Sequence, residues 1–266
     1  MFKLGDLSID RIQTGIAEDI NETEILYVLN QLADATIDIT AESKEVTDKD
    51  GNLIKKTYNA KSGTFTANNA MINTHILAAM SGSEIVEASG TAKIAMPKSM
   101  IVSAKATDIT LTDYVEGSVK VSAYYSNGAK GEKYTLGSVA SETEFVVDES
   151  GKLTLPKVAE GSGVTQFIVV YKRLVSAGGQ VSNYSDKFPK TIRLTLKALY
   201  IDPCHVDTLK PVYIVLPSFQ PSPETSIALQ TDTQLEYKGD LQIDYCSGNG
   251  KKLYDLFFPL DEEEEE

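Results

Sequence analysis

Hydrophobic and polar residues alternate in the stretch Thr36–Glu42, where every second side chain is apolar. A period of two is the mark of a half-buried strand. A turn cluster follows at Thr47–Asn52, and its Asp50-Gly51 step can take the positive φ that a tight reversal needs. Residues 53–67 then return as strand. The pattern therefore predicts a long, charged hairpin.

Helical spacing replaces this alternation from Ala70 to Met80. Asn68 or Asn69 can accept a backbone N–H as the helix cap, and Gly82 supplies a left-handed stop. An isolated helix of about eleven residues is marginal in water, so we expect its apolar side to pack on a sheet. Three polar residues, Asn73, Thr74 and Ser81, lie mostly off that side. The apolar stripe consists of Met71, Ile72, Ile76, Leu77 and Met80.

Short strands separated by turns, about ten residues apart, fill the chain after the helix. This spacing predicts an all-β chain, an antiparallel β-sandwich or barrel with one short flanking α-helix. Upstream, residues 21–32 fit either a buried strand centred on Tyr27 and Val28 or a short helix, and we favour the strand.

Three later stretches carry specific expectations. The run Val164–Val175 is almost continuously apolar, which predicts a central strand covered on both faces. Ala177–Gln180 is expected to reverse the chain, and Thr191–Leu199 alternates as a strand with one wet face. Pro217–Pro223 resembles a polyproline bridge that cannot join a ladder.

A chain of 266 residues is long enough for one large domain or two of ordinary size. We expect a single β-rich body over residues 1–266, with a possible subdomain at 97–260. Candidate boundaries are 83–90 and 160–163, although neither is a long linker. The six consecutive acids at 261–266 predict a solvated, disordered tail.

The order of elements also carries a family resemblance. A strand, a long charged hairpin, the string Lys61-Ser62-Gly63-Thr64-Phe65-Thr66-Ala67-Asn68-Asn69-Ala70, one short helix and further strands resemble the tail tube (major tail) proteins of long-tailed bacteriophages. The resemblance covers roughly the first two-thirds of the chain. It implies a structural virion protein that forms stacked hexameric rings around a channel for DNA. It also implies that the hairpin 43–57 reaches a neighbouring subunit or ring, and that the helix flanks the barrel outside.

Charge and hydropathy fit such a protein. The net charge of −13 argues against ordinary nucleic-acid binding, which needs a basic surface. A channel wall for DNA should instead repel phosphate, so that the cargo slides without sticking. No apolar run approaches the ~20 residues of a membrane span, and the N-terminus lacks a signal-peptide core. We therefore expect a product that is made in the host cytoplasm and becomes part of the virion tail.

Residues suited to catalysis or metal binding are sparse. The chain has two histidines, and one of them, His205, follows Cys204. Together with Cys246 these residues could suggest a zinc site, because cysteine and histidine are the usual zinc ligands. No Cys-x-x-Cys spacing occurs, however. His75 is interpreted as a structural residue of the helix. Asp48–Asn52 partly resembles a calcium loop, but it lacks the glutamate at the twelfth position. We expect no enzyme, no cofactor and no metal.

The sequence thus predicts a tail tube subunit whose partners are copies of itself, other tail proteins and DNA as non-specific cargo. The tip of the hairpin is too polar to build a core, so it should serve assembly rather than folding. An alternative is a surface-displayed, ligand-binding β-sandwich, such as an adhesin or virion decoration domain; a glycosidase-type enzyme is a third. The expected assembly residues are Lys44, Glu45, Asp48, Lys49 and Asp50.

Overall fold

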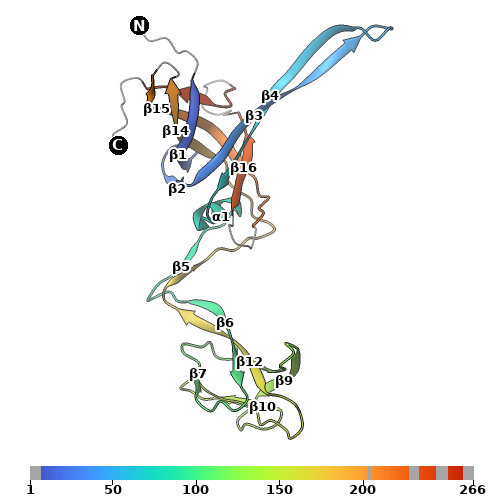
Figure 1. The fold of residues 1–266 in the computed structure, drawn as a ribbon, viewed down its shortest axis with the longest axis vertical. Coiled ribbons are helices and arrows are strands. Elements are labelled where there is room, and N and C mark those ends of the chain that lie inside the picture. Colours follow the sequence, from blue (N-terminus) through green and yellow to red (C-terminus); the bar gives the residue numbers. More distant parts are fainter. Residues whose placement is uncertain (1–6, 203–204, 228–233, 244–250, 260–266) are drawn as a thin grey trace. The chain divides into compact units, whose positions relative to one another are not determined.

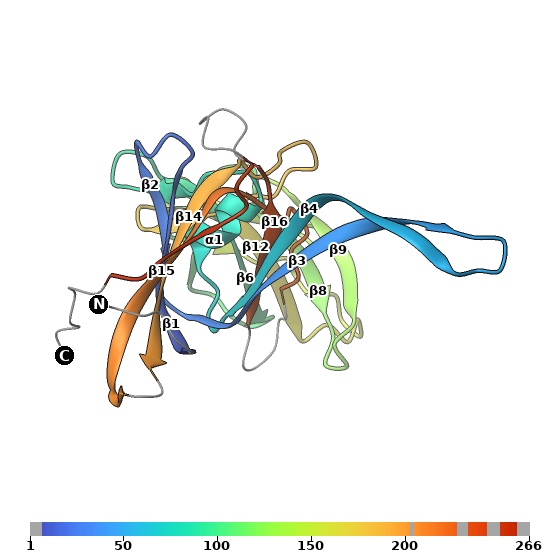
Figure 2. The same ribbon diagram turned by 90° about the horizontal axis from the view of Figure 1, so that it is seen from above.

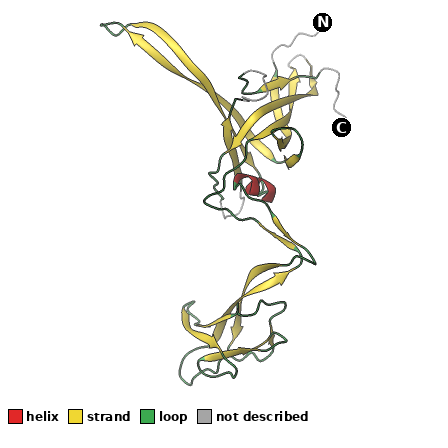
Figure 3. Ribbon diagram, turned by 180° about the vertical axis from the view of Figure 1, so that it is seen from behind, coloured by secondary structure: helices red, strands yellow, loops and turns green. Residues whose placement is uncertain are grey.

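The computed structural model describes residues 7–202, 205–227, 234–243 and 251–259, apart from the side chains of 202 and 205–207. In these ranges the chain is all-β with one short helix, which confirms the predicted fold class (Figures 1 and 3). It divides into two compact units: unit 1 comprises residues 1–85 and 181–266, and unit 2 comprises residues 86–180. The acidic tail 261–266 lies outside the described residues.

Unit 1 is built on a single curved antiparallel sheet. Its strands are β1 (Ser8–Asp19), β2 (Ile25–Leu29), β3 (Leu32–Thr47), β4 (Leu53–Asn69), β14 (Ile192–Asp202), β15 (His205–Pro221), β16 (Leu235–Leu241) and β17 (Asp255–Phe257). They lie in the order β2-β1-β14-β15-β16-β4-β3, with β17 paired to β15. The strand at Ile25–Leu29 confirms the preference for strand over helix in residues 21–32.

The sheet curls into a half-barrel because of one short connection. β2 and β3 are the two ends of the strand order, yet they are consecutive in sequence and only residues 30 and 31 join them. Leu29 and Leu32 are three Cα–Cα steps apart and can be separated by at most about 11 Å, so the two ends of the sheet must come close to one another. Figure 2 shows this curvature from above.

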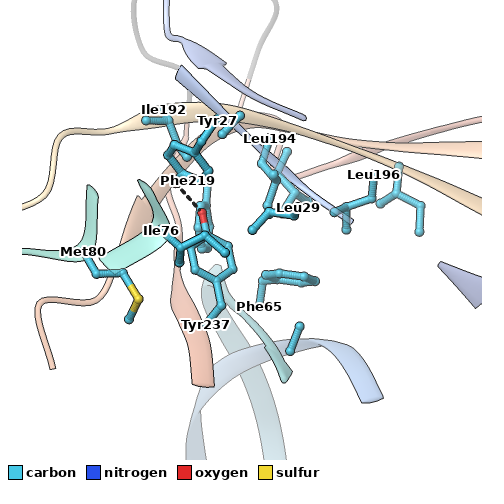
Figure 4. Packing of buried hydrophobic residues seen from close by; sticks show 14 of the residues in the cluster. Tyr27, Leu29, Phe65, Ile76, Met80, Ile192, Leu194, Leu196, Phe219 and Tyr237 are labelled. Atoms are coloured by element: carbon cyan, nitrogen blue, oxygen red, sulfur yellow. Dashed lines mark hydrogen bonds between the residues drawn. The ribbon is translucent and has the colours of Figure 1, made fainter. Parts of the chain in front are cut away.

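The core of unit 1 lies on the concave side of this sheet. Period-two alternation places Phe65 and Ala67 of β4 and Leu235 and Tyr237 of β16 on the same buried face. Phe65 meets the ring of Phe219 edge-on, with 5.8 Å between the ring centroids. Figure 4 shows this cluster together with the helix residues that close it.

The helix α1 (Thr74–Met80) is shorter than predicted. β4 continues to Asn69, so neither Asn68 nor Asn69 caps the helix. Asn73 is the cap instead: its side-chain Oδ1 accepts the N–H groups of His75 and Ile76, at 2.9 and 3.3 Å. The stop at Gly82 is as predicted, with φ of +60°.

One prediction for the second half of unit 1 is wrong. Pro217–Pro223 was expected to stay out of any ladder, but β15 continues through Pro221 and pairs with β16. The register between β14 and β15 shifts between the Leu194–Leu216 and Ile192–Phe219 pairs. Pro217 therefore falls at a bulge, where the absence of an N–H group costs no ladder bond.

Unit 2 has its own sheet and its own core. The strands are β5 (Val86–Ala88), β6 (Ile94–Ser103), β7 (Ile109–Thr110), β8 (Lys120–Tyr124), β9 (Lys130–Leu136), β10 (Glu144–Val147), β11 (Lys152–Thr154), β12 (Gln166–Val175) and β13 (Gly178–Gln180). Seven of them form a sheet in the order β6-β12-β8-β9-β10-β11-β7. The core includes Phe145, Phe167 and Tyr171.

β12 is central, as expected, but it is not covered on both faces. Phe167, Val169 and Tyr171 are buried, whereas Val170 on the opposite face is 37% exposed. Because the core covers only one face of this sheet, even an almost continuously apolar strand has its other face exposed to solvent. The chain also does not reverse at 177–180, because β13 continues onward and pairs with β5.

Candidate assembly surface

The long hairpin leaves the core and forms an arm, which we define as residues 42–61 of β3, its turn and β4 (Figure 1). Every residue of the arm is exposed except Asp48, which is half-buried. The buried part of β4 starts only at Gly63. A two-stranded ribbon without a covered face gains little from burial, so its shape depends on its ladder and its turn.

The turn is fixed by a carboxylate. Asp48 Oδ1 accepts the N–H groups of Asp50 and Asn52 at 2.9 and 2.8 Å, and Gly51 takes φ of +84°. The hydrogen bond from the Asn52 side chain, together with these backbone bonds, holds the pKa of Asp48 below its usual range. The same geometry recurs at Asp148 and Gly151 in unit 2. A short polar sequence therefore specifies both reversals.

One ion pair crosses the ladder of the arm. Lys56 Nζ lies 2.7 Å from Glu45 Oε1, and this hydrogen bond raises the pKa of Lys56. Both side chains are well exposed, so the pair contributes little to stability. The ion pair sets where these two side-chain charges lie on the arm but does little to hold the fold together.

The structure brings the five predicted assembly residues together. Lys44 and Glu45 lie on the outgoing strand, and Asp48, Lys49 and Asp50 form the tip. The same arm carries four large apolar side chains that were not predicted to be exposed, all about half-exposed or more. They are Val46 (49%), Leu53 (56%), Ile54 (67%) and Tyr58 (66%). Because the hairpin was predicted to have no core, the presence of these apolar residues in it was the signal in the sequence that pointed to an exposed apolar surface.

The predicted helix stripe holds only in part. Ile76 and Met80 are buried among the core residues of unit 1 and Leu77 is half-buried. Met71 and Ile72 precede α1 and are 64% and 41% exposed, which corrects their place in the stripe. The late start of the helix is the reason, because its apolar side begins only after Asn73.

The hairpin of β1 and β2 forms a second exposed surface in unit 1. On β2, the side chains of Ile25 and Val28 are 60% and 46% exposed. Within the described residues β2 pairs with β1 alone, so its outer edge is open. Acidic residues surround this edge. Glu22 binds Arg193, with Oε1 and Nη1 2.6 Å apart. Hydrogen bonds to the carboxylate of Asp19, above all the one from the backbone N–H of Asn21, lower the pKa of Asp19.

A third surface is the polar face of β3, β4 and β16, opposite the core. Three exposed side chains form a row across the strands, Asp38, Thr64 and Asp240. The next row contains Thr36, Thr66 and Lys238. We call these two rows the hydroxyl-acid face; Lys238 lies 3.4 Å from Glu224 and 3.6 Å from Glu236.

Residues considered for metal binding or catalysis do not gather in the described ranges. There, no group of three or more His, Cys, Asp or Glu side chains is placed to hold a metal ion. Cys204 and Cys246 lie outside the described residues, as does the side chain of His205. His75 is exposed on α1. Across the same ranges, no helix has the length and apolar character to cross a membrane.

An all-β chain with an exposed two-stranded arm has the features of a structural protein that associates with other chains. A family model, the YomU/Tube protein family, matches residues 9–249. The chain belongs to this family, which confirms the resemblance to phage tail tube proteins. It is accordingly a structural protein of the phage tail tube class.

Other comparisons add little. No curated protein matches the chain in sequence. Among solved structures, the crystal structure of the group B streptococcus pilus 2b backbone protein covers 85% of this chain and 80% of that chain, with 11% identity. Its TM-score of 0.20 is too low to support any inference about this protein.

Proposed function

We propose that the chain assembles into hexameric rings that stack into a tube, and that the tube is the channel for DNA passage. The observation that carries this proposal is the arm: a hairpin of twenty residues projects into solvent with four large apolar side chains uncovered. A subunit gains nothing from such an arm by itself. Copies that cover one another's arms gain the burial that one chain lacks.

The sheet ends support a ring. Within the described residues β2 and β3 each pair with one neighbour, so unit 1 presents two open edges. Open edges invite pairing with other chains, and a head-to-tail contact repeated around an axis closes a ring. Six copies would join their half-barrels into one continuous wall. The partners are then copies of this chain, with other tail proteins at the ends of the tube.

The channel wall is assigned to the hydroxyl-acid face. Its opposite side is the apolar core of unit 1, so this face meets either solvent or cargo. The excess of acids in the whole chain also belongs to unit 1, because residues 86–180 contain ten acidic and ten basic residues; the tail 261–266 supplies six of the thirteen negative charges, and the rest of unit 1 supplies seven. Hydroxyl groups and acids offer DNA phosphates little to bind. DNA would pass as non-specific cargo.

Negative-stain microscopy of the purified chain tests the proposal. The wild-type protein is expected to form rings or tubes, and a variant with Val46–Leu53 replaced by a two-residue turn is expected to stay a folded monomer. The control is the exchange Asn59→Ser, at an exposed position of the arm outside the expected assembly residues, which keeps the length of the arm. Isolated monomers of the wild type at high concentration, or unchanged tubes from the shortened variant, would refute the role of the arm.

A further inference from the structure

Charge is distributed unevenly between the two exposed hairpins of unit 1. The whole chain has a net charge of −13, but the arm, residues 42–61, has five lysines and four acids, a net charge of +1. Residues 18–28, the turn and edge of the β1–β2 hairpin, have four acids and no base, a net charge of −4. Arg193 of β14 lies 2.6 Å from Glu22 and 4.0 Å from Glu18, so the surface with this arginine included has a charge of −3. The arm is therefore nearly neutral, with a slight basic excess, on an acidic protein, and the acidic β1–β2 hairpin is its most suitable counterpart.

Both hairpins also expose apolar side chains that their own chain leaves uncovered. The arm presents Ile54 and Tyr58, which are 67% and 66% exposed, and β2 presents Ile25 and Val28, which are 60% and 46% exposed. The arm projects away from β2 in both views of the molecule, so the two do not cover each other within one chain (Figures 1 and 2). The apolar side chains of each surface can therefore be buried only by another molecule.

We propose that the arm of one copy docks on the β1–β2 hairpin of a second copy. Apolar residues supply the burial, and the lysines of the arm face the acids at 18–24 of the partner copy, which orients the contact. The two surfaces differ, so the contact is head-to-tail and leaves a free arm and a free hairpin on every dimer. Association then continues to a closed ring or a growing tube. This inference rests on the proposed function and names the contact that drives it.

Exchange of charges between the two surfaces tests the contact. Lys55 and Glu24 are suitable because neither forms an ion pair with another residue in the described part of the chain. Lys55→Glu and Glu24→Lys are each expected to raise the critical concentration for assembly about fivefold at low salt. The double variant should return to the wild-type value, and high salt should reduce the effect of both single changes. Sedimentation measures the assembled fraction.

A cross-link supplies the second readout. In a background of Cys204→Ser and Cys246→Ser, a protein with Ile54→Cys is mixed with one carrying Ile25→Cys, and the assembled sample is oxidised. We expect a disulfide-linked dimer of the two variants. The matched control replaces Ile25→Cys by Val139→Cys, a position in unit 2 that is 69% exposed.

The outcomes separate this inference from the proposed function. Tubes that form without charge rescue, and with no more cross-link than the Val139→Cys control, would overturn the arm-to-hairpin contact and leave the tube intact. A wild-type protein that forms no assembly at any concentration would overturn both. Charge rescue together with the selective cross-link would establish the contact.

Discussion

The hydroxyl oxygens of Tyr27 and Tyr237 lie 2.7 Å apart, although 210 residues separate them in the chain. Tyr27 belongs to the edge strand β2 and Tyr237 to β16, and their rings meet edge-on at a centroid distance of 6.4 Å. Both side chains are buried, with 6% and 0% of their surface exposed (Figure 4). Each hydroxyl satisfies the other inside an apolar core, so the pair ties the edge of the half-barrel to its far side.

Removal of one hydroxyl should cost more than removal of both. Tyr27→Phe leaves the Tyr237 hydroxyl buried without its partner, which is expected to lower the free energy of unfolding by about 1–3 kcal/mol. The double variant Tyr27→Phe/Tyr237→Phe should recover most of this loss. Denaturant unfolding of the four proteins in a double-mutant cycle measures the coupling. Additive losses would mean that the two hydroxyls do not interact.

Alkaline pH should loosen the same pair. Burial raises the pKa of Tyr27 and of Tyr237 above the usual value of 10.0. Above about pH 10 the unfolded chain releases these protons while the folded chain retains them, so the free energy of unfolding falls as pH rises. The double Phe variant should show a shallower decline. Equal slopes for the two proteins between pH 9 and about 11 would contradict this account.

The helix offers a contrast between packing and capping. Ile76→Ala removes a fully buried side chain from the core of unit 1, at an expected cost of roughly 2–5 kcal/mol. Asn73→Ala removes the cap and should cost about 0.5–2 kcal/mol. Thr74→Ala, at an exposed position of the same helix, is the control. Calorimetry that ranks the three variants in another order would show that α1 is not held by the core.

A glycine on β16 makes room for the neighbouring backbone. A Cβ added at Gly239 would lie 2.2 Å from the carbonyl oxygen of Gln220, whereas one at Gly63 would meet only the side chains of Ile39 and Leu241. Gly239→Ala should therefore cost about 1–3 kcal/mol, and Gly63→Ala less, because methyl groups can move. Melting temperatures of the two variants test this ranking. A Gly63→Ala variant that melts lower would reverse it.

Local patterns in the sequence predicted part of the local structure of this chain. Period-two alternation predicted the hairpin, and the glycines at 51 and 82 adopt the positive φ expected of them. The order of the strands was beyond such reasoning, because pairs such as β1 with β14 join residues about 180 apart. Burial of Tyr27 against Tyr237 is equally non-local. Pro217 shows the same limit, since only the register of the neighbouring strand creates the bulge that admits it.

The candidate assembly surface could be predicted for its charges and not for its apolar part. Lys44 and Asp48 stand out in the sequence because no core accepts them. Ile54 and Tyr58 look like ordinary strand residues, and their exposure follows only from the point at which the core ends at Gly63. Met71 and Ile72 fit a helical stripe by spacing, but the helix begins after them. The exposure of a side chain depends on its tertiary context, which the spacing of apolar residues along the sequence does not show.

Acid should weaken the turn at Asp148 in unit 2. Hydrogen bonds from the Ser150 hydroxyl and from the N–H groups of Ser150 and Lys152 lower the pKa of Asp148 below 3.8. The stabilisation is present above the unfolded-state pKa and is lost as pH falls through the lower folded-state value. Asp148→Asn keeps an acceptor oxygen but does not titrate, so its melting temperature should decline less below about pH 4. Parallel declines of the two proteins would contradict this role.

The hydroxyl-acid face should tolerate a change of charge without loss of the subunit's fold, because its side chains project away from the core. Asp38 and Asp240 both lie in the row with Thr64 and are exposed. The variant Asp38→Lys/Asp240→Lys is expected to form tubes like the wild type and to melt at a similar temperature. Six subunits would then add twelve lysines to every ring, and a channel that repelled phosphate would bind it. Wild-type tubes are expected to leave a short, labelled DNA duplex free. Tubes of the variant should bind it, and the binding should fall steeply with salt as counterions compete for phosphate.

A second variant with two surface acids of unit 2 changed to lysine, Glu116→Lys/Glu142→Lys, carries the same total charge and separates the effect of the hydroxyl-acid face from that of added charge elsewhere. If both variants bind the duplex equally, the hydroxyl-acid face is not the channel wall, and the wall belongs to another part of the chain.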